Sequence, residues 1–401
     1  MRASVKWVVL GGAFVAYMFD ALEILLLSLS LPDIRASFGL TAAQGGLLAT
    51  ATLLGIGVSS VTVGWLADNY GRKRALLLSL AVFGIFTAAL AVVPNFTVFL
   101  ALRFVAGLGL GGVWGAVSTY VVETWPAAQR GRATAFVLSS FPVGGAVAAL
   151  LAGALLPNWR LLFFLAGVGV VVPLLIVGLF FSESAEWAEQ KSTPVKVAEI
   201  FAPALRRRTL LGAVVAGLAL FGWWGGSTWL PTYLHTDRGI PTATVSLFLT
   251  VLNLGMFAGY NVFGVIADRI GRKYALILSL AGVGVTLPLY VVAADRSALL
   301  WLGPLFAFFA AFSGIFGAYL GELFPTRVRA TGAGFCFNVG RGVSAFAPLA
   351  LGALATGVGL GTGLVVCAGF FLCSAFVMTF LPNLSSAAPI PALSLETEGA
   401  T

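Results

Sequence analysis

The feature that most constrains this chain is a series of long apolar runs. A helix that crosses a bilayer needs about 20 predominantly apolar residues, and the sequence contains twelve runs of about that length. Soluble domains carry roughly 25% charged residues, whereas this chain carries 9% and is 59% hydrophobic. We therefore predict an all-α membrane protein with twelve transmembrane helices. The expected spans are approximately residues 7–31, 43–66, 75–93, 96–121, 134–156, 161–181, 209–233, 244–267, 275–293, 297–320, 331–355 and 361–381.

Positive charge between the runs predicts the orientation of the spans. Seventeen of the 23 Lys and Arg residues fall at the N-terminus or in connections on its side of the membrane, and four fall on the other side. Because connections rich in Lys and Arg stay in the cytoplasm, we expect a multi-pass protein of the cell membrane with both termini in the cytoplasm. A bacterial inner membrane is the expected location. This topology also explains the net charge of +8, so we expect the lipid bilayer, and no nucleic acid, as a partner.

One long polar connection divides the runs into six and six. It covers residues 182–208, carries several glutamates and ends in an Arg-Arg-Arg run. We expect one six-helix bundle over residues 1–181 and a second over 209–381, joined by a cytoplasmic linker over 182–208. The tail over 382–401 is rich in Pro, Ala and Ser, and we expect it to be disordered.

An internal repeat relates the two halves. GWLADNYGRKRALLLSL from Gly64 recurs as GVIADRIGRKYALILSL from Gly264, and ETWPAAQRGRAT from Glu123 recurs as ELFPTRVRAT from Glu322. Both pairs fall in equivalent connections of the two halves. Two halves in the same orientation are the parallel-repeat architecture found among membrane transporters. We predict two pseudo-symmetric six-helix bundles around a central cavity.

The repeated connection is a family motif. Gly-x-x-x-Asp-x-x-Gly-Arg-Lys stands twice, and the fourth span contains RFVAGLGLGG from Arg103. In these motifs the chain resembles the major facilitator superfamily of transporters, over nearly its whole length. The first copy departs from the family by Asn69 where a basic residue is usual, and the second has Arg269. The resemblance implies a secondary transporter that works by alternating access.

Charged residues of the repeated connections predict a gate on the cytoplasmic face. An Asp at the end of a span can accept hydrogen bonds from a nearby helix N-terminus, and the adjacent basic residues can meet acids or lipid phosphates. Such a lattice across the two halves would hold this face closed and break when it opens. The alternative is that these residues only anchor the topology. The expected gate residues are Asp68, Arg72, Asp268, Arg272, Glu123, Arg130, Glu322 and Arg329.

Two acids, Asp20 and Glu23, lie near the middle of the first span and project from roughly the same face of a helix. An ionisable group at bilayer depth costs about 2.5–3.5 kcal/mol, so it faces a cavity, a partner or a transport path. At a rise of about 1.5 Å per residue, Glu23 reaches the level of Arg103 in the fourth span, and we predict that the two side chains pair. We expect Asp20, Glu23 and Arg103 to couple protons to transport. A purely structural ion pair is the alternative.

Arg341 is the second cation expected within a span, near the middle of the eleventh. Asn338 lies one turn before Arg341, and Tyr17 lies one turn before Asp20. A guanidinium can hold a carboxylate by two parallel hydrogen bonds, so we expect Arg341, Asn338 and Tyr17 to bind an anionic substrate. The alternative is that Arg341 is satisfied by helix-end carbonyls or by Asp20.

Two short stretches resemble symporters of organic acids. FNVGR, residues 337–341, is similar to the eleventh span of the lactate/sialate-type symporters. DALE, residues 20–23, is similar to the Asp-Gly-aromatic-Asp of aromatic-acid symporters, from which its last three residues depart. We expect proton-coupled symport of a small organic anion, a monocarboxylate such as lactate. Two alternatives stay open: a proton-driven antiporter of drugs or metabolites, and a non-transporting membrane receptor.

The sequence contains no recognisable group of catalytic residues. The sequence has no GxxxxGK[ST] loop, which argues against direct ATP drive. Its one histidine, His235, lies in an expected external connection, and its three cysteines lie in apolar runs without metal-ligand spacing. We expect no catalytic residues, no metal and no cofactor, and a monomer that binds a small organic anion and a proton.

Overall fold

The computed structural model describes residues 3–125, 130–183, 197–325 and 328–383, and the regular structure within these ranges is helical. The first half contains α1 (Ala3–Phe38), α2 (Ala42–Tyr70), α3 (Arg72–Ala89), η1 (Leu90–Val92), α4 (Phe96–Thr124), α5 (Arg130–Leu138), α6 (Ser140–Leu155), α7 (Trp159–Gly169) and α8 (Val171–Phe180). The second half contains η3 (Val197–Phe201), α10 (Pro203–Thr232), η4 (Tyr233–Asp237), α11 (Thr242–Ile270), α12 (Arg272–Val292), α13 (Arg296–Phe309), α14 (Phe312–Glu322), α15 (Arg329–Ser344), α16 (Ala347–Val358) and α17 (Leu360–Thr379).

Twelve stretches of the described helices are long and apolar enough to cross a membrane, which confirms the predicted fold class. Four of these spans consist of two consecutive α-helices: α5–α6, α7–α8, α13–α14 and α15–α16. In the first of them, Pro142 stands in the first turn of α6. A proline is tolerated there because the N–H groups of a first helical turn have no partner within the helix. The span is therefore interrupted between α5 and α6 without the loss of a helical hydrogen bond at this proline.

Two helices, α1 and α10, depart most from the predicted boundaries. α1 continues past residue 31 to Phe38, because a polar turn at the edge of a membrane can stay helical after the apolar run has ended. The helix stops before Gly39, whose φ of +63° suits glycine. α10 begins at Pro203, inside the predicted linker, with the proline in its first turn. The domain boundaries stay predictions, and residues 184–196 of the linker and 384–401 of the tail lie outside the described residues.

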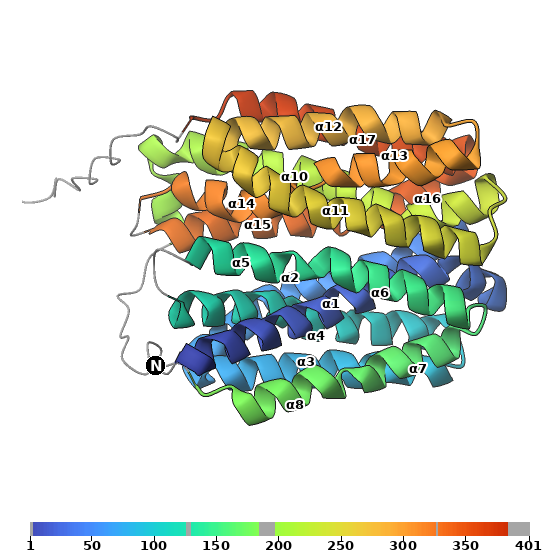
Figure 1. Cartoon of the computed structure of the whole chain (residues 1–401), viewed down its shortest axis with the longest axis horizontal. Helices are drawn as coiled ribbons and strands as arrows, with labels where there is room; N and C mark the ends of the chain where they lie inside the picture. Colours follow the sequence, from blue (N-terminus) through green and yellow to red (C-terminus); the bar gives the residue numbers. More distant parts are fainter. Residues whose placement is uncertain (1–2, 126–129, 184–196, 326–327, 384–401) are drawn as a thin grey trace, which may run out of the picture.

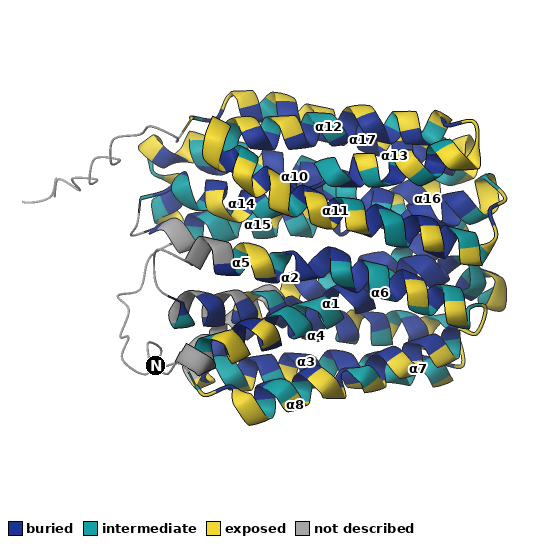
Figure 2. Ribbon diagram, in the orientation of Figure 1, coloured by how far each residue is buried: buried dark blue, intermediate teal, exposed yellow. Residues whose placement is uncertain are grey.

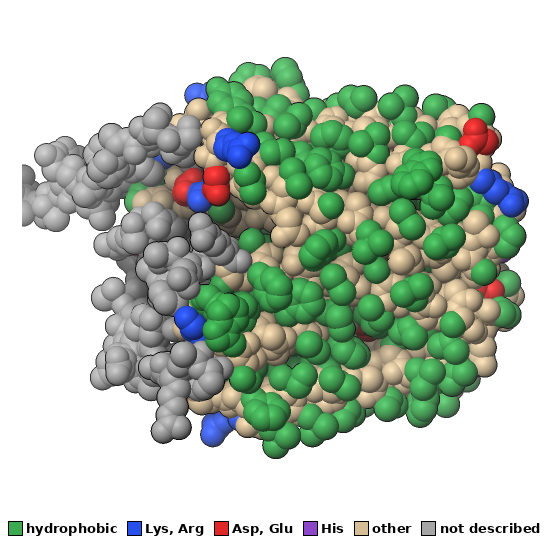
Figure 3. Space-filling model, in the orientation of Figure 1, with side chains coloured by type: hydrophobic (Ala, Val, Ile, Leu, Met, Phe, Trp, Pro, Cys, Tyr) green, Lys and Arg blue, Asp and Glu red, His purple; other side chains and the backbone are tan. Residues whose placement is uncertain are grey.

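The helices run side by side along the long axis of the molecule (Figure 1), with α1–α8 in one bundle and α10–α17 in the other. α1 begins and α17 ends at the same end, called here the terminal end; the end where α1 finishes at Phe38 is called the far end. Figure 2 shows buried residues on the helix sides that face neighbouring helices. The charged side chains visible in Figure 3 gather toward the two ends and leave a largely apolar wall between them. Such a wall suits contact with the hydrocarbon of a bilayer.

The two bundles are pressed together at the far end, where α2 contacts α16. A Cβ placed on Gly46 would lie 2.3 Å from the carbonyl oxygen of Pro348, so the backbones of the two helices touch. The same carbonyl accepts a hydrogen bond of 2.8 Å from Trp229 Nε1, and the Arg35 guanidinium lies 5.7 Å above the Trp229 ring. Small residues allow such close approach of helices in membranes. These contacts close the far end.

Gly46→Ala is expected to destabilise the protein by about 1–3 kcal/mol, the usual cost of overpacking, because the new methyl group would overlap the Pro348 carbonyl. Gly57→Ala in the same helix is the matched control, since nothing lies within 4 Å of the Cβ position there. Thermal unfolding of the two purified variants measures the difference. Equal unfolding midpoints would contradict the backbone contact between α2 and α16.

Candidate functional site

A cavity of about 870 Å³ lies between the two bundles. Its walls come from α1, α4, α5 and α6 of one bundle and from α10, α11, α14 and α15 of the other. It extends from Asp20 in the middle of α1 to Glu322, which ends α14 at the terminal end. Gly317 and Ala318 on its wall are exposed. With the far end closed, this central cavity is reached from the terminal end.

Asp20 and Arg341 line this cavity from different bundles. Asp20 lies on α1 and is 4% exposed, and Arg341 lies on α15. The two interact electrostatically with each other and with Tyr17, yet among the described residues no ion pair joins them. Asp20 Oδ1 also has no hydrogen-bond partner there. Because an unpaired buried polar atom is costly, the arrangement is one that a ligand between the two side chains would complete.

Asn338 and Tyr17 also line the central cavity. Asn338 stands one turn before Arg341 on α15, and the ring of Phe337 lies 5.7 Å from the guanidinium. The Tyr17 ring packs against that of Trp114 with a centroid distance of 5.0 Å. The structure thus brings together the three residues that we expected to bind substrate. Their role in binding stays a prediction.

A polar pair in the cavity wall was missed by the sequence analysis. The hydroxyl groups of Tyr260 on α11 and Ser313 on α14 are hydrogen-bonded to each other and line the central cavity. The tyrosine ring fits beside Gly314, where a Cβ would come within 3.1 Å of it. Neither residue belongs to a recognisable motif. Aromatic residues in spans mostly mark interfaces or packing, so the sequence offered no specific signal for this pair.

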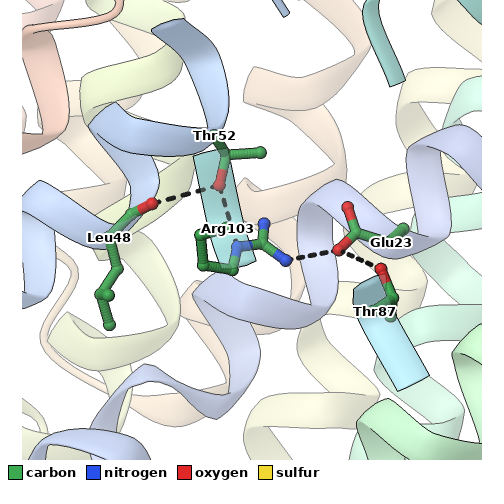
Figure 4. Close-up of polar contacts among 5 residues, drawn as sticks. All are labelled: Glu23, Leu48, Thr52, Thr87 and Arg103. Atoms are coloured by element: carbon green, nitrogen blue, oxygen red, sulfur yellow. Dashed lines mark hydrogen bonds and ion pairs between the residues drawn. The ribbon is translucent and has the colours of Figure 1, made fainter. Parts of the chain in front are cut away.

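Glu23 is absent from the lining of the central cavity and instead pairs with Arg103 (Figure 4). The guanidinium donates through Nη1 to Glu23 Oε1 and through Nε to Thr52 Oγ1, the second bond being 2.9 Å long. Thr87 Oγ1 donates to the same Glu23 oxygen at 3.0 Å. Thr52 in turn donates to the Leu48 carbonyl at 3.1 Å. This network joins α1, α2, α3 and α4, so the predicted ion pair is confirmed, while its proton-coupling role stays a prediction.

The separation of the two acids follows from helix geometry. Three residues along an α-helix place Glu23 about 60° around the axis from Asp20 and about 4.5 Å further along it. Because α1 lies at the boundary between the bundle core and the cavity, this offset is enough to send one carboxyl to each. The expectation that both acids share a face therefore holds only coarsely.

Arg103→Met is expected to lower stability by about 3–5 kcal/mol, because the carboxylate of Glu23 would stay buried without its partner. The side chains of Arg103 and Glu23 are 0% and 2% exposed. The double variant Glu23→Gln/Arg103→Met removes both charges and is expected to regain most of the loss. Thermal unfolding in detergent measures both effects. A double variant no more stable than Arg103→Met would refute the energetic coupling of the pair.

Two of the predicted gate residues, Arg272 and Glu322, form an ion pair. Arg272 begins α12 and Glu322 ends α14, so both belong to the second bundle. This ion pair therefore does not link the two halves, and the expected gate across them stays a prediction. Asp268 is exposed near the end of α11, and Arg72 begins α3. The gate side chains that lie outside the described part are Asp68, Glu123, Arg130 and Arg329.

The lysines of the repeated motif have a role that sequence analysis did not assign. Lys73 Nζ donates a 2.8 Å hydrogen bond to the carbonyl of Gly178 near the end of α8. Lys273 Nζ donates to the carbonyls of Thr379 and Leu381 at the end of α17, at 2.8 and 2.6 Å. Carbonyls at a helix C-terminus lack helical partners and favour a cation. Each motif lysine therefore ties the third span of its bundle to the sixth.

The fold and the central cavity define a class of protein: membrane transporters built from two repeated bundles around a site between them. Residues 9–316 match the Major Facilitator Superfamily, and the chain belongs to that family. It is 33% identical to the cis,cis-muconate transport protein of Acinetobacter baylyi, with 92% of each chain covered. It is 30% identical to the sialic acid transporter NanX of Escherichia coli, with 89% of each chain covered.

A solved structure supports the fold independently. A bacterial homologue of the human lysosomal transporter Spinster, in an inward-facing and occupied conformation, is 16% identical to this chain, with a TM-score of 0.76. The similarity covers 95% of this chain and 97% of that structure. At this level of identity the comparison shows the shared fold.

Proposed function

We propose that this protein is a secondary active transporter that carries a small organic anion together with a proton by alternating access. The observation that carries the proposal is that Asp20 and Arg341 face one cavity from different bundles without forming an ion pair. A substrate carboxylate would accept two parallel hydrogen bonds from the guanidinium. The amide of Asn338 and the hydroxyl of Tyr17 are the neighbouring polar groups.

Asp20 is the proposed proton carrier. A carboxylate held by Arg341 enters the field of Asp20, and two like charges at short range in a low dielectric repel each other. Protonation of Asp20 removes this repulsion, so the anion and the proton bind better together than separately. Such reciprocal coupling is what symport requires. Glu23 interacts electrostatically with Asp20 and is held by Arg103, so we include this pair in the proposed proton-coupling group.

The membrane potential supplies a reason to carry a proton. An anion that enters a cell against a negative-inside potential of 100 mV pays about 2.3 kcal/mol per charge. One accompanying proton cancels that charge. In the proposed orientation the terminal end lies in the cytoplasm, at the inner membrane of a bacterium, and the central cavity opens toward the cytoplasm. Alternating access would then open the far end and close the terminal end, where the expected gate residues lie.

The proposed substrate is a monocarboxylate such as lactate. Relatives named for the transport of muconate and sialic acid support an organic acid. A cavity of about 870 Å³ with aromatic side chains such as Trp114 and Phe337 on its wall also has room for acids larger than lactate. Uptake assays should therefore include benzoate and a dicarboxylate beside lactate.

Arg341→Lys is expected to lower uptake of the best acid about tenfold or more in liposomes with an inward proton gradient. The ammonium group keeps the charge but loses the paired hydrogen bonds, and a hydrogen bond to a charged group is worth about 1.5–3 kcal/mol. Arg296→Lys, at the exposed start of α13 and outside the cavity lining, is the matched control variant with expected wild-type uptake. Unchanged uptake in both Arg341→Lys and Arg341→Ala would exclude carboxylate binding at this arginine.

Asp20→Asn is expected to keep exchange of labelled for unlabelled acid but to lose accumulation driven by the proton gradient, because the amide imitates a permanently protonated carboxyl. The ratio of gradient-driven uptake to exchange is the measurement. Accumulation at the wild-type level would show that the proton is carried elsewhere. Expulsion of a cationic dye by an inward proton gradient would indicate the antiporter, and acid binding without any flux would indicate the receptor.

A further inference from the structure

Trp223 separates the central cavity from a second space. This apolar chamber has a volume of about 60 Å³ and lies among α1, α6, α10, α11, α12, α13 and α17. Among the described residues, Trp223 alone lines both the chamber and the central cavity. Its ring is half-buried and meets that of Phe312 edge-on, with a centroid distance of 6.4 Å. The indole is therefore the shared wall of the two spaces.

The chamber continues the central cavity toward the far end. Along α1, Ile24 lines the central cavity, and Leu25 and Leu29 line the chamber. Along α11, which runs back from the far end, Leu249 lines the chamber and Met256 lines the central cavity. Five to seven residues of helix correspond to a rise of about 7–11 Å. The two spaces therefore lie in sequence along the direction in which a transported molecule would cross the protein.

Small side chains leave room for the chamber. Gly145 and Ala149 of α6 and Gly222 and Gly226 of α10 line it, and most of its other wall residues are leucine and phenylalanine. About 60 Å³ is several times the roughly 10–15 Å³ that a cavity measured in the same way needs to hold one water. The chamber thus has room for a short apolar extension of two or three carbon atoms. Its apolar lining favours such a group over an ion.

We propose that the chamber is an apolar subsite for the end of a transported acid remote from its carboxylate, and that Trp223 closes it and so limits the length of acid transported. The proposal rests on the organic-acid transport proposed above. With the carboxylate at Arg341, the distal end of a longer acid meets the indole when the bundles close around it. Removing the indole joins the chamber to the central cavity and gives that end a place to lie.

Cysteine labelling tests whether Trp223 separates the chamber from the central cavity, and it does not depend on transport activity. Ser227 lines the chamber, and its Oγ is buried with no hydrogen-bond partner among the described residues. Ser227→Cys in a Cys373→Ser background, which removes the exposed cysteine, reports entry of a charged methanethiosulfonate from the central cavity. Adding Trp223→Ala is expected to raise the labelling rate at least about tenfold, because reactivity follows access.

Trp114→Ala is the matched control for labelling, since it enlarges the central cavity without bordering the chamber. It is expected to leave the labelling rate unchanged. Equal labelling rates of Ser227→Cys with and without Trp223, whether fast or slow, would overturn the assignment of Trp223 as the wall.

Length selection is measured with butyrate, hexanoate and octanoate in proteoliposomes. For Trp223→Ala, the kcat/KM of the longest acid relative to the shortest is expected to rise at least about tenfold, the discrimination that a methylene makes in an apolar pocket. Trp223→Leu is expected to give an intermediate ratio and replaces the alanine variant if that variant does not fold. Trp114→Ala is expected to change the kcat/KM of all three acids in parallel.

Gly226→Ala fills part of the chamber from another side. A Cβ at Gly226 would lie 3.9 Å from Cys367 Cβ and from Leu364 Cδ2, which is ordinary contact, so the methyl group fits. In the Trp223→Ala background it is expected to reduce the gain for the longest acid. The subsite is refuted if Trp223→Ala still transports the shortest acid but leaves unchanged the kcat/KM of the longest acid relative to the shortest. A wild type that transports neither these acids nor lactate, benzoate or a dicarboxylate refutes the transport proposal instead. The labelling result then still tests whether Trp223 separates the two spaces.

Discussion

A charge at the depth of a bilayer must be compensated or must face a polar space, and this requirement governs how α1 is placed. Glu23 is compensated inside the first bundle by Arg103 and two threonines. Asp20, one turn earlier, faces the central cavity opposite Arg341 of the second bundle. Of these two neighbouring acids, Glu23 thus helps to hold the first bundle together, and Asp20 belongs to the candidate site. The charge of Glu23 is balanced within the first bundle by Arg103, whereas the pairing of Asp20 depends on what lies between the bundles.

The fold could be predicted because its signals are local. Apolar length defines the spans, and a ten-residue motif repeated after 200 residues defines the two halves. The pairing of Glu23 with Arg103 could also be predicted, because the constant rise of a helix converts residue number into depth. Depth likewise placed Asp20 and Arg341 at comparable levels. These inferences need only one coordinate, the position along the membrane normal.

Features that depend on the rotation of a helix about its axis and on its neighbours could not be predicted from the sequence. Nothing in the spacing of Tyr260 and Ser313 shows that their hydroxyl groups meet across two helices. The motif lysines end on backbone carbonyls, which every residue has and which therefore leave no pattern. The partner of Glu322 proved to be Arg272, because α12 and α14 are neighbours in one bundle. A prediction of which half supplies a partner needs the packing of helices as well as their depth.

The contact of Gly46 with the Pro348 carbonyl has a mechanical consequence for the far end. At this point the two helices meet through backbone atoms. Separating them therefore frees few side-chain rotamers, and bringing them together again restricts few. The change in side-chain entropy on each transport cycle is small. The attraction between the helices here comes from close atomic contact, and a gap of about 0.5–1 Å already forfeits a quarter to a half of such an attraction. The contact between α2 and α16 therefore weakens over a very short separation. Once the two helices have parted by about an ångström, little of its attraction opposes further opening.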